Sequence, residues 1–281
     1  MEFADLVPAL MGMAGGTLTR AIEVPMKQLD DWWFVHFGSK TELERQKQEF
    51  LNQQKLTEFK QEILDQVKQI PPEDITEPNK AILGPTIEAS KYYIDDDSLR
   101  KMFAKLFASS VDSRLENKTR SAFVEFVKQF SPVDAQLLKI IVQYGNTIPL
   151  AQIKIVYTDD SFVINRTNVV APEISIRLND NKQIASSIDN LNRLGLISVT
   201  YMFYKRIDYK VFESTIPYKE TQLSVEQRNK QLSDLLSSEA AQNIRPEVKK
   251  ELVHEQNARV DIEKGKADLT SLGKDFTQVV L

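Results

Sequence analysis

Few residues in this chain have the types that catalysis most often uses. The 281 residues include no cysteine and only two histidines, His36 and His254, which lie in distant segments. The chain therefore has no thiol nucleophile, thiolate metal site or disulfide framework, and the histidines argue against a histidine-based acid–base or metal site. No phosphate-binding glycine loop or serine–histidine–acid motif is present in the sequence. These absences predict a protein that is not an enzyme, with no catalytic residue, no metal site and no cofactor.

One acidic run is of a type that binds divalent metals. Asp95, Asp96 and Asp97 are consecutive, but no further acidic ligand follows at the spacing of an EF-hand loop. Carboxylates at a helix N-terminus are favoured by the helix dipole and accept hydrogen bonds from its free amides. We therefore expect the run to cap the helix that follows it, and the alternative is a metal-binding loop.

The overall composition predicts a globular, cytoplasmic protein of one large or two ordinary domains, with 42% hydrophobic residues. The chain has 36 Lys+Arg against 40 Asp+Glu, which gives a formal net charge of −4. This charge argues against a protein that coats nucleic acid nonspecifically, although a local basic face remains compatible with it.

Residues 1–40 form an apolar N-terminal arm. Both tryptophans lie there, and the apolar run is too short for a conventional transmembrane helix. The acidic start is unlike a secretory signal. We expect an arm that packs on the core or in a dimer, and the alternative is an interfacial membrane anchor. The residues for membrane or partner contact are Leu6, Leu10, Trp32, Trp33, Phe34 and Phe37.

Residues 41–130 have the pattern of a helical domain. Thr41 and Glu44 have the form of a capping box, and the prolines and glycine of residues 71–85 indicate a linker with one turn or short helix. Apolar residues recur at three- and four-residue spacing, which predicts helices over 41–70, 87–94, 99–107 and 119–130.

Residues 131–281 predict a winged-helix-like α+β domain. Ser131, Pro132 and Asp134 mark a helix start, and Gly145 and Gly195 suit the ends of two helices. The pattern predicts helices over 132–144, 149–156 and 181–194, then a hairpin of 196–203 with 209–216. The fold class is thus mainly α, with an N-terminal helical domain followed by a winged-helix-like domain that carries a helical insertion.

The third of these helices and the expected hairpin are the candidate contact with nucleic acid. Residues 179–212 contain five basic residues against three acidic ones. This local charge is thin beside the roughly six to ten phosphate contacts of strongly salt-dependent binders. We therefore favour a winged helix that contacts protein over one that reads DNA. The basic residues for nucleic-acid contact are Lys182, Arg193, Lys205, Arg206 and Lys210.

A polar segment interrupts the C-terminal domain at about residues 219–258. Its spaced leucines and valines predict two polar helices broken near Arg245 and Pro246, which form a solvated arm. We expect residues 260–269 to return as a strand next to the wing, and Ser271 to start a terminal helix.

Several short blocks, in order along the chain, resemble one known family. They are IPPEDITEP (70–78), GPTIEASKYY (84–93), LRKMFAKLFASS (99–110), AFVEFVKQFSPVDA (122–135) and DLTSLGKDF (268–276). Together they are similar to the Abi-alpha (abortive infection alpha) family of bacterial proteins, over most of residues 40–218 and 258–281. The resemblance implies a part in phage defence and brings no catalytic motif.

Three functions are compatible with these patterns. The resemblance favours a noncatalytic cytoplasmic protein of phage defence that acts through protein–protein contacts, with a phage-derived partner or as a homo-oligomer. The winged-helix pattern offers a DNA-binding transcriptional regulator as an alternative. The apolar arm offers a peripheral membrane effector or immunity protein as another.

Overall fold

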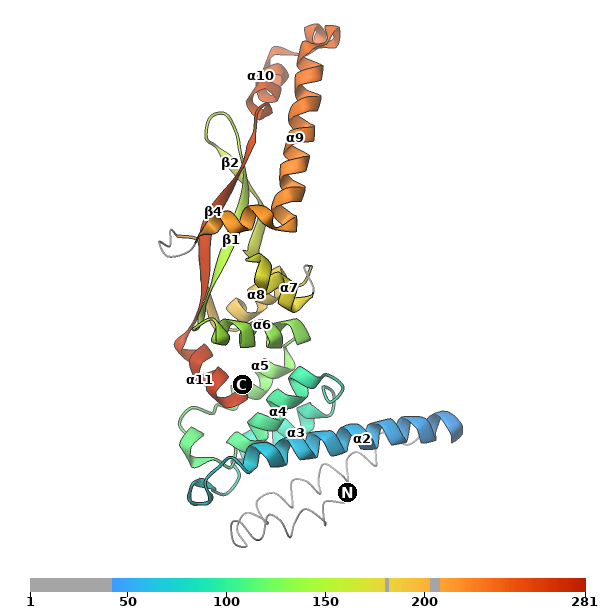
Figure 1. Cartoon of the computed structure of the whole chain (residues 1–281), viewed down its shortest axis with the longest axis vertical. Helices are drawn as coiled ribbons and strands as arrows, with labels where there is room; N and C mark the ends of the chain where they lie inside the picture. Colours follow the sequence, from blue (N-terminus) through green and yellow to red (C-terminus); the bar gives the residue numbers. More distant parts are fainter. Residues whose placement is uncertain (1–41, 180–181, 203–207) are drawn as a thin grey trace. The chain divides into compact units, whose positions relative to one another are not determined.

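The computed structural model describes residues 42–179, 182–202 and 208–281 (Figure 1). The fold is mainly helical, with 60% helix and a small antiparallel sheet of four strands. Two compact units divide the chain. The first contains residues up to Ala135 together with Ser271–Leu281, and the second contains Gln136–Thr270. The N-terminal arm and its six candidate contact residues lie outside the described residues.

The first unit is a group of helices around α4. Its core consists of aromatic and aliphatic residues at helical spacing. Phe103, Leu106 and Phe107 of α4 and Phe59 and Ile63 of α2 have almost no exposure, and the two helices are in contact. The helix α2 ends at Val67, four residues before Pro71, as expected from the loss of the proline N–H. The elements are α2 (Glu42–Val67), η1 (Pro72–Asp74), α3 (Lys80–Ser90), α4 (Asp97–Ser109), η2 (Ser113–Leu115), α5 (Ala122–Lys128) and α11 (Ser271–Val280).

Helix starts in this unit follow the predicted capping chemistry. The side chain of Asp96 accepts a hydrogen bond from the backbone N–H of Leu99 at 2.9 Å, so the acidic run caps α4. Ser131 and Asp134 form a reciprocal capping box. The Asp134 N–H donates to the Ser131 hydroxyl, and the Asp134 carboxylate accepts from the Ser131 N–H. Thr41 of the other predicted capping box lies outside the described residues.

Helix α3 begins earlier than the sequence predicts. Residues 71–85 were expected to be a linker, yet α3 starts at Lys80 and continues through Pro85. The Asn79 side chain caps it by accepting from the Ala81 N–H. Ile82, Leu83 and Ile87 are buried on one face. This burial, on both sides of the proline, offsets the backbone hydrogen bond that Pro85 cannot donate.

Helix α11 returns to this unit from the far end of the sequence. Its Phe276 is fully buried, and the ring lies 5.1 Å from that of Phe123, edge to face, and 5.6 Å from that of Phe130. Such edge-to-face pairs contribute beyond their buried area. The terminal helix is therefore an integral part of the helical core.

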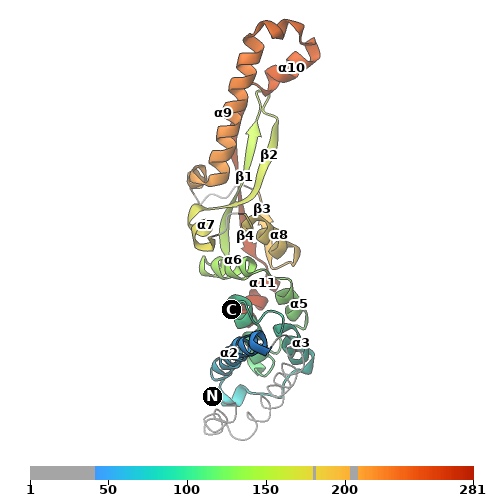
Figure 2. The same ribbon diagram turned by 90° about the vertical axis from the view of Figure 1, so that its right-hand side faces the viewer.

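The second unit is built on a four-stranded antiparallel sheet in the order β2-β1-β4-β3 (Figure 2). The strand β4 pairs with β1 along ten residues without a register shift and with β3 at its other edge. The strands are β1 (Thr147–Val156), β2 (Phe162–Val170), β3 (Ile197–Thr200) and β4 (Arg259–Leu269), and the helices before β3 are α6 (Pro132–Gln143), α7 (Pro172–Leu178) and α8 (Ile184–Arg193).

Two predictions in this unit are wrong. Residues 149–156, expected to be a helix, belong to β1, because Ile148 and Leu150 alternate with Ala151 and Ile153 and both faces are buried. A strand that is covered on both faces gives an apolar run that resembles a buried helix. The expected hairpin partner, residues 209–216, is also not a strand.

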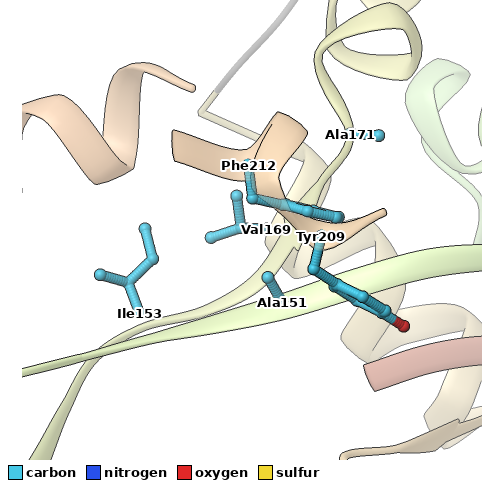
Figure 3. Packing of buried hydrophobic residues seen from close by; sticks show 6 residues of the cluster. All are labelled: Ala151, Ile153, Val169, Ala171, Tyr209 and Phe212. Atoms are coloured by element: carbon cyan, nitrogen blue, oxygen red, sulfur yellow. The ribbon is translucent and has the colours of Figure 1, made fainter. Parts of the chain in front are cut away.

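Residues 209–214 instead form the 3-10 helix η3 (Tyr209–Ser214). Tyr209 and Phe212 lie three residues apart, the spacing that eclipses side chains in a 3-10 helix, and their rings stack with centroids 5.5 Å apart. Figure 3 shows both rings against Ala151, Ile153 and Val169 of the sheet. The true partner of β3 is β4, the strand expected over residues 260–269.

The polar segment forms the two helices that were predicted. They are α9 (Ile216–Ser237) and α10 (Pro246–Glu255), with the short η4 (Glu239–Asn243) between them. Pro246 is the first residue of α10, where a missing N–H costs nothing. Helix α9 lies along the sheet, and its Tyr218 packs on the cluster of η3 (Figures 1 and 2).

Candidate functional site

The basic residues predicted to contact nucleic acid do not form one patch in the described part of the chain. Lys205 and Arg206 lie outside it. Lys182 precedes α8 and Arg193 ends that helix, so the two stand about 16 Å apart along its axis at 1.5 Å per residue. Lys210 belongs to η3. All three described side chains are exposed.

The outer face of α8 is a regular polar surface of the second unit. Lys182, Ser186, Asp189 and Arg193 follow one another at four-, three- and four-residue spacing and are exposed. Ile184, Ile188 and Leu191 bury the opposite face. The guanidinium of Arg193 donates to the Asn190 side chain at 2.7 Å. Ser187, on the same helix, is buried and does not belong to this face.

A partly buried polar network fixes α8 to the sheet. Asn168 sits at an irregularity of β2 with a positive φ of 53°, and its side-chain amide donates to the Asp189 carboxylate at 2.7 Å. The Tyr201 hydroxyl donates to the Asn168 side chain at 2.6 Å and accepts from the Asn168 N–H at 2.9 Å. Burial raises the pKa of Tyr201, and the nearby Asp189 charge acts in the same direction.

Gly265 of β4 makes room for this network. A Cβ at this position would lie 2.4 Å from a ring carbon of Tyr201 and 2.8 Å from the Thr200 carbonyl oxygen. The Gly265 carbonyl also accepts a hydrogen bond of 2.6 Å from the Tyr209 hydroxyl. Only glycine fits between the two tyrosines, so the position of Tyr201 and hence of α8 depends on it.

The structure brings a serine, a histidine and an aspartate together at the turn between β1 and β2. His254, at the end of α10, contacts Asp159 at 2.8 Å and Ser161 at 3.4 Å. The Tyr157 ring lies 5.1 Å from the imidazole, and Thr158 donates to the His254 carbonyl. Sequence reasoning missed this cluster because 93 residues separate Ser161 from His254.

The geometry of this cluster differs from that of a catalytic triad. In a triad the serine and the acid bond to different nitrogens of the imidazole, so that one nitrogen can take a proton while the other is held. Here both Ser161 and Asp159 approach Nε2. Hydrogen bonds from Ser161 and from His254 hold the pKa of Asp159 well below its usual range. The contacts join α10 to the turn.

Beside this turn lies an apolar segment that the sequence analysis did not single out. Phe162, Val163 and Ile164 begin β2 and are all exposed. The Phe162 ring is held by the Lys154 ammonium, 4.5 Å from its centroid. The sequence pattern that could have indicated this segment is a run of three large apolar residues directly after the polar residues Asp159, Asp160 and Ser161.

The described residues show neither a group of three or more metal-ligating side chains nor a helix long and apolar enough to cross a membrane. Among known proteins, the model of one family, described as "Abortive infection alpha", matches residues 51–280. No curated protein and no solved structure matches the chain.

Proposed function

The chain belongs to the abortive infection alpha family, and on this premise we propose that it is a cytoplasmic phage-defence protein that acts through protein contacts and not through catalysis. The observation that carries the proposal is the family match itself. The match runs from within α2 to the end of α11, so it covers residues of both compact units and is not confined to one of them.

The arrangement of polar groups supports action by contact. The most triad-like cluster, Asp159, Ser161 and His254, directs both partners to one imidazole nitrogen. The partly buried network of Asn168, Tyr201 and Asp189 makes its hydrogen bonds within the unit. Such internally satisfied networks hold a fold in one conformation rather than leave a group ready to react.

We assign the partner contact to the outer face of α8. This face carries both charges, with Lys182 and Arg193 at its ends and Asp189 between them. Asp189 is also bound from beneath by Asn168, so the helix is presented in a fixed position. A rigid surface of mixed charge suits a protein partner, because ordering it on binding costs little conformational entropy. In this proposal a phage-derived protein is the partner.

Phage challenge tests the proposal. Cells of a phage-sensitive host would express the wild-type chain, the empty vector or Gly265→Val, which forces a branched side chain into Tyr201. We expect fewer plaques and death of infected cells before phage release only with the wild type. Equal plaque numbers and equal survival in all three strains would remove the proposal.

A DNA-binding regulator is the second candidate. It is favoured by the order α6, β1, β2, α7, α8, β3 and β4 of the main elements. Because β3 and β4 are paired, this order suits a winged helix whose wing contains the α9–α10 insertion. In that case α8 enters the major groove. Binding to a defined operator should then weaken with salt and on Lys182→Ala/Arg193→Ala. Operator binding that weakens neither with salt nor in the double variant would contradict this candidate.

A further inference from the structure

The outer edge of the sheet carries an exposed apolar segment. β2 pairs with β1 on one side only and is the first strand in the sheet order. Its first residues keep about half of their surface exposed, at 50% for Phe162, 47% for Val163 and 48% for Ile164. Long apolar edges are normally blunted or covered, because their unpaired backbone groups are a template for another strand.

The backbone of this edge has hydrogen-bonding groups that point outward. The Tyr157 N–H donates to the Ser161 carbonyl at 2.9 Å, so these two residues face each other across the turn. In an antiparallel ladder the direction alternates along each strand. The N–H and C=O of Val163 therefore point toward β1, and those of Phe162 and Ile164 point away from it.

The length of the open edge is limited by two irregularities of β2. Register shifts occur on both sides of the pair between Ile153 and Arg166, and Asn168 has a left-handed backbone. Bulges twist a strand and interrupt pairing. Asp160 in the turn before β2 also has a left-handed backbone. A partner strand is therefore restricted to the start of β2 and its nearest neighbours, residues 161–165, which we name the edge segment.

The edge segment is complementary to itself when read in the opposite direction. Its sequence is SFVIN, with one polar residue on each side of the three apolar residues. Antiparallel pairing about Val163 sets Phe162 opposite Ile164 and Ser161 opposite Asn165. Each pairing joins two apolar or two polar side chains, which is the arrangement that stabilises cross-strand pairs.

We propose that a second copy of this chain pairs with the edge segment, antiparallel, across a two-fold axis through Val163. The outward N–H and C=O groups of Phe162 then bond to those of Ile164 in the second copy, as alternation requires. A two-fold contact needs one self-complementary patch, and this segment supplies it.

The test compares two matched substitutions on the full-length chain. Ile164→Lys introduces a positive charge from each copy into the proposed interface. Ile176→Lys makes the same change at a control position on α7, where Ile176 is 77% exposed. Sedimentation equilibrium of the wild type should show a dimer that forms with rising concentration. We expect Ile164→Lys to weaken it by about tenfold or more and Ile176→Lys to leave it unchanged. A wild type that stays monomeric, or equal effects of both variants, would overturn the proposal.

Cross-linking tests the register independently. The chain contains no cysteine, so Val163→Cys introduces the single thiol of the protein. At a two-fold axis, opposed residues of a pair that is not hydrogen-bonded have Cα atoms about 4.5 Å apart, which is within the range of a disulfide. Diamide should oxidise two such thiols to one intermolecular disulfide in the dimer, but not those of Ile176→Cys. Equal cross-linking of both variants, or none in a dimeric sample, contradicts pairing at Val163.

Discussion

The hydroxyl of Tyr201 makes two hydrogen bonds to one residue, donating to the side chain of Asn168 and accepting from its backbone N–H. Asn168 is buried at the irregular part of β2, where the ladder leaves its backbone unpaired with β1. One tyrosine therefore satisfies two polar groups that the strand itself cannot satisfy. The stability of the second unit should depend on that hydroxyl.

Tyr201→Phe tests this dependence. The change keeps the ring but leaves the buried Asn168 groups without a partner, so we expect a loss of about 1–3 kcal/mol in the free energy of unfolding. Tyr144→Phe, at an exposed position, should change it by less than about 0.5 kcal/mol. Urea denaturation measures both values. Equal values for the two variants would mean that the double hydrogen bond contributes nothing.

Two glycine-to-alanine changes should differ in size. At Gly265 the new Cβ would overlap Tyr201 and the Thr200 carbonyl, so we expect a loss of about 1–3 kcal/mol. At Gly84, inside α3, no atom beyond the two chain neighbours lies within 4 Å of the new Cβ. The helix propensity of alanine is opposed there by Pro85, which disfavours a helical residue with a Cβ before it, so we expect a change of less than about 1 kcal/mol. Thermal melts of both variants compare the two effects, and a stabilised Gly265→Ala would refute the steric role of Gly265.

The buried guanidinium of Arg100 should be the most sensitive charge in the first unit. Its side chain is only 10% exposed, contacts Glu62 and Asp97 at 3.0 Å and donates to the Ile94 carbonyl. Arg100→Met removes the partner of the partly buried Glu62, and we expect a loss of about 3–5 kcal/mol.

Lys101→Met is the matched control, because Lys101 pairs with the same Asp97 at an exposed position. An exposed ion pair contributes about 0–1 kcal/mol. Denaturation curves that place both variants at the same stability would show that burial of Arg100 does not matter.

The turn between β1 and β2 should make stability depend on acid. The folded pKa of Asp159 is lowered by hydrogen bonds from Ser161 and from His254, so the carboxylate stabilises the fold above its unfolded pKa of about 3.9. This contribution is lost as the pH falls from there through the lowered folded pKa. The stability gap between the wild type and Asp159→Asn should thus shrink as urea titrations move from about pH 5 to lower pH. A gap that grows toward low pH would contradict the sign.

The sequence predicts local structure well where a single residue determines it. Asp96 caps α4, Gly145 and Gly195 have the positive φ expected at the ends of α6 and α8, and Pro246 starts α10. Each of these features depends on neighbours within a few residues. Local chemistry was therefore sufficient to place most helices.

Pairings between distant segments were beyond local patterns. β2 was not expected, because its exposed start and its irregular asparagines show no alternation. β3 was given the wrong partner, since the correct strand, β4, follows an insertion of about forty residues. The contact of His254 with Asp159 could not be predicted for the same reason, because the two residues are far apart in the sequence. Of the candidate contact residues, Lys182, Arg193 and Lys210 fall on exposed sites but on separate elements.

The central claim is that this protein defends against phage by contact and without chemistry of its own. The most direct measurement is a phage challenge of cells that express the wild type or Ser161→Ala/His254→Ala, with folding of the variant checked by urea denaturation. We expect equal reductions in plaque number, because the cluster joins α10 to the turn and does not act on a substrate. A folded variant that has lost protection would contradict the claim.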